Sequence, residues 1–124
     1  MKSPLHNAVD GATICAISTA PGAGGIAVVR ISGDDALALG SQVFSKNLSV
    51  VADREAVFGR FRDASGTLLD EGLALIFRGP KSYTGENTVE FNIHGSTYIQ
   101  SEVMRALIEA LSLIHISEPT RPRE

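Results

Sequence analysis

"TAPGAGGIAVVRISG", residues 19–33, decides how this sequence folds, because its four glycines either grip a phosphate or join two strands. Residues 22–27 satisfy the G-x-G-x-x-A pattern of dinucleotide-binding loops, which requires a helix directly after the glycines. The segment that follows, "IAVVRIS", is rich in β-branched residues, which favour strands. The Gly-Lys-Ser/Thr of a P-loop is missing as well. The stretch therefore predicts a glycine-rich connection between two strands.

Arg30 is the residue that this interpretation leaves unexplained. On a strand over residues 25–32, Ile26, Val28 and Arg30 share one face, because side chains alternate between the two faces of a sheet. A charge in the middle of an apolar strand is costly unless it has a partner. Either a carboxylate of the same chain or a bound ligand would serve, and the residues alone do not decide between them.

A second polar cluster lies on the segment "NTVEFNIHG", residues 87–95. Apolar and polar residues alternate here, which predicts a half-buried strand with Glu90, Asn92 and His94 on one face. Such a face is by default exposed to water, and composition alone favours that reading over a binding site.

The rest of the chain supplies the other elements of a layered domain. Ala64–Gly66 separates two strand-like segments and predicts a hairpin. Ser32 followed by Asp35 fits a helix-capping signal. The predicted strands are residues 13–19, 25–32, 55–63, 67–79 and 87–95, and the predicted helices are residues 33–44 and a second helix from residue 96. The order β-β-α-β-β-β-α predicts an α+β fold with a mixed sheet and helices packed on it.

Composition restricts the class of protein. The 124 residues suffice for one domain with its own core. The net charge of −3, with acidic residues interleaved among Arg54, Arg60 and Arg62, argues against a nucleic-acid surface. The single cysteine, Cys15, excludes an internal disulfide and a cysteine-built metal site, and its apolar surroundings predict a core residue. No segment reaches membrane length, and the N-terminus does not resemble a secretion signal.

The two ends of the chain differ in character from its middle. Residues 1–11 are expected to form a flexible lead-in, and residues 12–112 the folded domain. Residues 113–124 contain two prolines and alternating charges, and they resemble a translated cloning-vector tail. We expect this tail to be non-native and exclude His115 from functional reasoning for that reason.

Two longer motifs resemble the signatures of one family. "TICAISTAPGAGGIAVVRISG", residues 13–33, resembles the N-terminal signature of the MnmE/TrmE family of tRNA modification GTPases, and "GPKSYTGENTVEFNIHG", residues 79–95, resembles its second signature. The resemblance extends from about residue 11 to about residue 111. It implies a fold similar to the folate-binding domains of aminomethyltransferases. It also implies binding of 5-formyl- or 5,10-methylene-tetrahydrofolate and formation of a homodimer.

The resemblance further implies which residues contact the folate. The arginine of R-I-S-G is Arg30, and the folate-contacting glutamate is Glu90, the second glutamate of T-G-E-x-x-x-E. A carboxylate accepts hydrogen bonds from the ring N–H and the exocyclic amine of a pterin together. The arginine would hold a folate oxygen or orient the glutamate. The other expected pocket residues are Gly24, Gly25, Thr84, Gly85 and His94. A third family contact, a lysine in an N-G-K-L motif, does not occur in this sequence. No catalytic residue and no metal site are expected.

In the family, helical and GTPase domains follow this domain, and a flavin-dependent partner subunit helps to modify carbon 5 of the wobble uridine of tRNA. GTP, Mg²⁺ and K⁺ would belong to the GTPase domain. This sequence contains no GTP-binding motif, so we expect the chain alone to be inactive. The expected location is the cytoplasm, or the mitochondrion for a eukaryotic source. The alternatives are a dimerisation scaffold with a disabled folate pocket and a relative of the aminomethyltransferases, which the R-I-S-G and S-Y-T-G-E motifs oppose.

Overall fold

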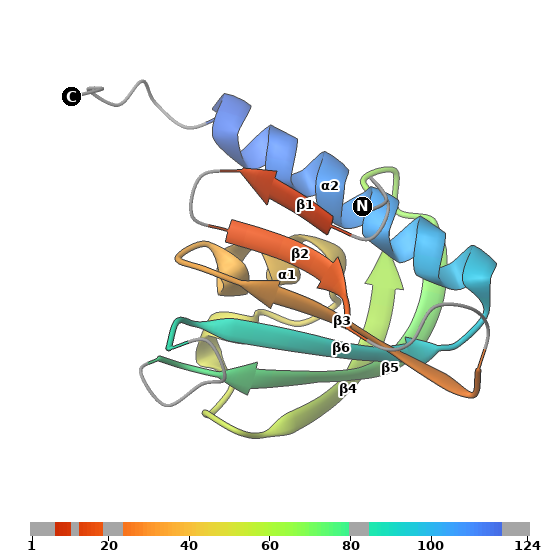
Figure 1. The fold of residues 1–124 in the computed structure, drawn as a ribbon, viewed down its shortest axis with the longest axis horizontal. Coiled ribbons are helices and arrows are strands. Elements are labelled where there is room, and N and C mark those ends of the chain that lie inside the picture. Colours follow the sequence, from red (N-terminus) through yellow and green to blue (C-terminus); the bar gives the residue numbers. More distant parts are fainter. Residues whose placement is uncertain (1–6, 11–12, 19–23, 80–84, 118–124) are drawn as a thin grey trace.

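Six strands form one antiparallel sheet in the computed structural model, which describes residues 7–10, 13–18, 24–79 and 85–117. The order of the strands across the sheet is β1-β2-β3-β6-β5-β4 (Figure 1). The strands are β1 (Asn7–Asp10), β2 (Thr13–Ile17), β3 (Ile26–Ser32), β4 (Ala56–Arg62), β5 (Leu68–Phe77) and β6 (Thr88–His94). The helices are α1 (Ala36–Val43), the 3-10 helix η1 (Leu48–Val50) and α2 (Thr97–Ser117).

The α+β class is confirmed, and the predicted strands and helices follow in the predicted order from β2 onward, but the directions of the strands differ from the prediction. All five strand pairings are antiparallel, whereas the sequence predicted a mixed sheet. Parallel neighbours need a crossover connection, often a helix. Here the chain leaves β3 through α1, builds the β4–β5 hairpin and enters β6 from the end where β5 stops. The central strands β3 and β6 are therefore antiparallel neighbours.

Strand β1 lies inside the segment that was expected to be a flexible lead-in. Asn7–Asp10 pairs with β2 from Asn7 opposite Ala16 to Asp10 opposite Thr13. The added strand satisfies N–H and C=O groups that β2 would otherwise present at the edge of the sheet. Main-chain hydrogen bonds carry no sequence signal, and a four-residue strand with two apolar side chains is too short for a clear alternation.

Helix α1 is shorter than the predicted helix over residues 33–44, and its start is built differently. Asp35 precedes the helix but makes no side-chain capping bond. Its backbone N–H donates to the hydroxyl of the buried Thr13 at 3.2 Å. Gly33 adopts a φ of 137°, which favours glycine. The turn from strand to helix thus depends on a side chain of β2, which local sequence reasoning does not reveal.

The core lies between the sheet and the two helices. Phe61 and Phe91 meet edge to face with ring centroids 4.7 Å apart, and Phe44 lies 5.1 Å from Phe61. Cys15 is fully buried among apolar side chains, as predicted. Burial raises the pKa of its thiol to about 12, because the thiolate would lose its hydration.

Helix α2 closes the core with buried residues spaced three and four apart, which is the pattern of an amphipathic helix. These residues are Val103, Met104, Leu107 and Leu111. The helix continues to Ser117, past residue 112, where the sequence predicted the domain to end. No helix among the described residues is long and apolar enough to cross a membrane.

Candidate functional site

Both helices pack on the same face of the sheet, as Figure 1 shows, and we call the opposite face the open face. Glu90, Asn92 and His94 of β6 point to the open face, while the residues between them fill the core. Val28 and Arg30 of β3 share this face, because β3 and β6 pair in register. The alternation predicted for both strands is confirmed. Neither helix covers the polar residues.

Arg30 and Glu90 lie directly opposite each other on these two strands. Nε and Nη2 of Arg30 donate to Oε2 of Glu90 at 3.0 and 2.8 Å. The side chains are 34% and 14% exposed, so water hydrates the pair only in part. The sequence left open whether the arginine meets a carboxylate of the chain or a ligand, and the structure supplies the carboxylate. Oε1 of Glu90 accepts no hydrogen bond from the described residues.

Apolar side chains flank this ion pair along its own row of the sheet. Ala16 lies opposite Arg30 on one side, and Leu75 lies opposite Glu90 on the other. In the next row, Val28, Asn92 and Leu73 follow one another across three strands, and Leu73 is 39% exposed. Polar groups in apolar surroundings interact more strongly than they do in water. A molecule that covered this face would therefore meet a concentrated polar site.

The predicted glycines Gly24 and Gly25 lie where β3 begins, away from the ion pair. The N–H of Gly24 donates to the carbonyl of Gly95, and the N–H of Gly95 donates to the carbonyl of Gly25, each at 3.2 Å. A Cβ on Gly95 would lie 2.1 Å from the Gly24 oxygen, whereas a Cβ on Gly24 or Gly25 meets no described atom within 4 Å. Close approach of the backbones thus requires glycine at position 95, which the sequence analysis missed. The His-Gly step that ends the predicted strand was the available signal.

His94 lies four residues from Glu90 along β6, which is about 13 Å at the usual strand rise. Its Nδ1 is 2.8 Å from Oδ1 of Asp70, and its backbone N–H donates to Oδ2 of the same carboxylate at 2.8 Å. The Asp70 side chain is only 7% exposed, while the His94 ring is 70% exposed. Asp70 therefore fixes the position of His94, and the sequence analysis did not single it out. Its signal was one of two adjacent carboxylates, Asp70 and Glu71, near the start of a strand whose other residues are apolar or glycine.

The T-G-E segment precedes β6 at the other end of the site. Thr84 lies outside the described residues. Gly85 is exposed and has a φ of 80°, a conformation that favours glycine. The next residue, Glu86, accepts a hydrogen bond from the Ser32 hydroxyl at 3.4 Å. The structure thus joins Arg30 to Glu90 and places Gly85 beyond one end of this pair and Gly24, Gly25 and His94 beyond the other.

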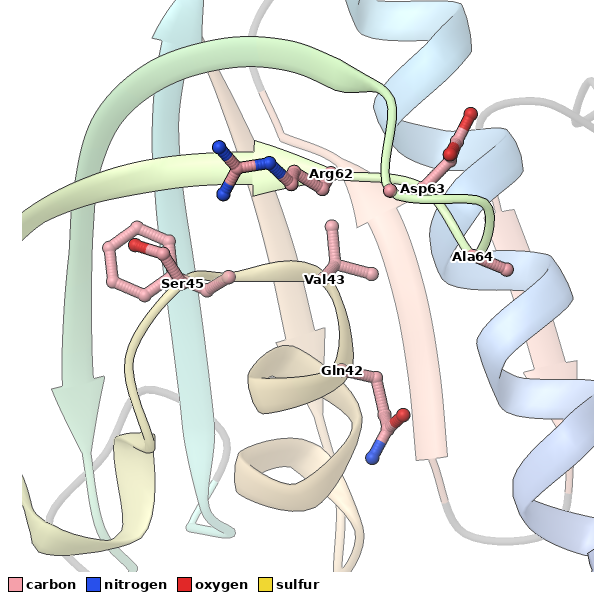
Figure 2. A pocket seen from close by; sticks show the side chains of 8 residues that line it. Gln42, Val43, Ser45, Arg62, Asp63 and Ala64 are labelled. Atoms are coloured by element: carbon pink, nitrogen blue, oxygen red, sulfur yellow. The ribbon is translucent and has the colours of Figure 1, made fainter.

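A shallow pocket lies elsewhere, between the end of α1 and the β4–β5 turn (Figure 2). Its volume is about 250 Å³, below the range of roughly 300–1,000 Å³ that is typical of small-molecule sites. Asp63 lines this pocket, but its carboxylate accepts hydrogen bonds from residues of its own turn. The bond from the Ser65 hydroxyl, followed in size of effect by the bond from the Thr67 backbone N–H, holds the pKa of this carboxyl below its usual value. None of the predicted site residues lines this pocket.

Comparison with known proteins identifies the family. Residues 13–120 match the family described as "GTP-binding protein TrmE N-terminus". The chain belongs to this family. It is 45% identical over 103 residues to the tRNA modification GTPase MnmE of Parabacteroides distasonis. The aligned region covers 79% of the chain and 22% of that protein. It is 50% identical over 101 residues to the MnmE of Halorhodospira halophila, which covers 82% of the chain and 21% of that protein.

A third relative supports the same assignment. The MnmE of Acinetobacter baumannii is 41% identical over 105 residues, which covers 85% of the chain and 23% of that protein. The chain therefore spans about a fifth of the length of the relatives that it matches. The resemblance that rested on two motifs extends to residues 13–120 of the chain.

Proposed function

We propose that this chain is the tetrahydrofolate-binding and dimerising N-terminal domain of a GTPase that modifies the wobble uridine of tRNA. The observation that supports folate binding is the Arg30–Glu90 pair on the open face, with one carboxylate oxygen left without a partner among the described residues. In the whole protein, GTP with Mg²⁺ and K⁺, a flavin-dependent partner subunit and the tRNA would act through other parts. The proposed location is the cytoplasm, or the mitochondrion for a eukaryotic source.

The chemistry of Glu90 suits the head group of a folate. A carboxylate has about four acceptor sites, and Arg30 uses two of them at Oε2. Oε1 can accept from a ring N–H or an amine of the pterin. If both pterin donors pair with both oxygens, at least one Arg30 bond must shift. The guanidinium of Arg30 could then donate to an oxygen of the ligand. Arg30 would thus both orient Glu90 and hold a folate oxygen, which are its two expected roles.

The surroundings of the pair also suit a flat ring. Val28 and Leu73 provide apolar contact beside the carboxylate, and Glu90 is held on a central strand of the sheet. Gly24 and Gly25 have open space around them among the described residues, and neither has a positive φ. A bound molecule that approaches the backbone would explain glycine at both positions.

Calorimetric titration with 5-formyltetrahydrofolate tests the folate part of the proposal. We expect the chain to bind this folate and Glu90→Gln to bind it at least about tenfold more weakly, because a hydrogen bond to a charged group contributes roughly 1.5–3 kcal/mol. Glu71→Gln is the matched control, since it removes a carboxylate that pairs with Arg60 at 3.1 Å and is 46% exposed. Equal affinity of Glu90→Gln and the parent chain would remove Glu90 from the site.

The alternative is a dimerisation scaffold without a working folate pocket. It is supported by exposed apolar side chains on the open face, where Ile14, Ile26, Phe58 and Leu73 lie among partly buried neighbours. Solvent-exposed apolar surface of this kind is a feature of protein interfaces. A dimer without any folate binding would favour this alternative.

Light scattering after size exclusion, at tens of micromolar chain, tests the dimer. We expect the parent chain to have twice the monomer mass and Leu73→Lys to shift it toward the monomer. Tyr98→Lys is the control, since Tyr98 is 72% exposed but lies on α2, away from the open face. A monomeric parent chain, or equal effects of the two variants, would contradict dimerisation through the open face.

A further inference from the structure

Asn92 is a polar residue of the open face for which neither the fold nor the proposed contacts account. It follows Glu90 by two positions on β6, so the two side chains point the same way, about 7 Å apart along the strand. Val28 lies opposite Asn92 on one side and Leu73 on the other. The side-chain amide has no hydrogen-bond partner among the described residues, although Asn92 is half-buried.

An amide between two apolar neighbours would be a poor choice for a surface that only packs. It weakens apolar contact with anything that covers the face, and a covered amide without a partner is costly. The same amide is useful if the covering molecule offers a complementary group. A ligand that reaches Glu90 with one edge and lies along β6 brings its next polar atom to Asn92.

We propose that Asn92 is a specificity-determining residue of the site, whose amide N–H donates to the ring carbonyl oxygen of the folate head group. The inference rests on the proposed folate function. The head group presents an amine, a ring N–H and a carbonyl oxygen in sequence along one edge. Glu90 can accept only from the first two of these. The carbonyl oxygen needs a donor, and Asn92 is the next polar side chain on the strand beyond Glu90.

The experiment replaces the hydrogen-bond donor of the protein by an acceptor and, separately, the acceptor of the ligand by a donor. The two ligands are 5-formyltetrahydrofolate and its 4-amino analogue, in which an amine replaces the ring carbonyl. Asn92→Asp keeps the shape of the side chain but replaces the amide donor by a carboxylate. We expect Asn92→Asp to weaken binding of the 4-oxo ligand about tenfold or more and to leave or improve binding of the 4-amino ligand. Gln42→Glu, an exposed amide-to-carboxylate change on α1, is the control for added charge and should change neither affinity.

Every result of this experiment either supports or overturns the inference about Asn92. Equal fold-changes for the two ligands in Asn92→Asp would overturn the inference, and so would a change in dimerisation without a change in ligand preference. If the parent chain bound neither ligand, the proposed folate function itself would fail, and the inference with it. If the inference about Asn92 were wrong and the folate function correct, Glu90→Gln would still bind 5-formyltetrahydrofolate more weakly than the parent chain does.

A measurement on the parent chain covers the case in which the variant does not fold. In nitrogen–proton correlation spectra, the assigned side-chain amide signals of Asn92 should shift when 5-formyltetrahydrofolate is added, whereas those of Asn47 should not. Asn47 is the matched reference, because it is an exposed amide that caps η1. Unmoved Asn92 signals at saturating ligand would exclude the contact.

Discussion

The two faces of the same strands differ in burial and in chemistry. On β6, Val89, Phe91 and Ile93 are at most 2% exposed against the helices, whereas Glu90, Asn92 and His94 alternate with them and face the other way. The covered face is almost purely apolar, while the open face combines charged pairs, among them Arg30–Glu90 and Arg60–Glu71, with scattered apolar residues. Neighbouring positions in the sequence therefore divide between the core and the proposed recognition surface, and substitutions on the two faces should have separate consequences.

The largest expected effect is on the covered face. Phe91→Ala should lower the free energy of unfolding by about 3–5 kcal/mol, because it leaves a cavity beside Phe44 and Phe61. Leu73→Ala on the open face should cost less than about 1 kcal/mol, since Leu73 is already 39% exposed. Urea unfolding of both variants measures the difference. Similar losses would show that the open face contributes to the stability of the chain as much as the core does.

The second expected effect also belongs to the covered face and appears only at high pH. The pKa of Cys15 is raised to about 12 by burial, from 9.0 when it is exposed. The unfolded chain then releases its proton first, so the contribution of Cys15 is fully present below pH 9 and is lost as the pH rises toward 12. The loss is about 1.4 kcal/mol per pH unit, or about 2 kcal/mol at pH 10.5.

Cys15→Ala is the comparison for this pH dependence. It should be less stable than the parent at neutral pH but should decline less steeply above pH 9, as urea unfolding at a series of pH values would show. Parallel curves for the two chains would mean that the thiol is hydrated in the fold.

The smallest expected effect is on the open face. A double-mutant cycle with Arg30→Met and Glu90→Gln should give a coupling energy of about 1 kcal/mol or less, because both side chains are partly exposed. The coupling should fall as salt is added. A coupling of several kcal/mol, insensitive to salt, would mean that this ion pair is part of the fold rather than of a recognition surface.

Most of the fold follows from local patterns in the sequence. The β-branched run after the glycines, the hairpin at residues 64–66 and the alternation of residues 87–95 each predict a strand that the structure contains. Strand β1, the antiparallel order of the sheet and the contact of Thr13 with the start of α1 do not follow, because each depends on a partner that is distant in the sequence or on main-chain bonds alone.

The site divides in the same way. The costly position of Arg30 within an apolar strand predicted a partner, and pairing with Glu90 follows from the register of β3 and β6. The sequence did not show that Asp70 holds His94 or that Gly95 rather than Gly24 carries the steric requirement, because both depend on how non-neighbouring segments approach.

The buried thiol of Cys15 has a practical consequence for spectroscopy. It is the sole cysteine of the sequence, and in the folded state it lies in the core, out of reach of maleimide reagents. A single cysteine introduced by Leu73→Cys would accept a fluorescent dye selectively under native conditions. Changes in the emission of that dye would then report, in real time, when a molecule settles on the sheet.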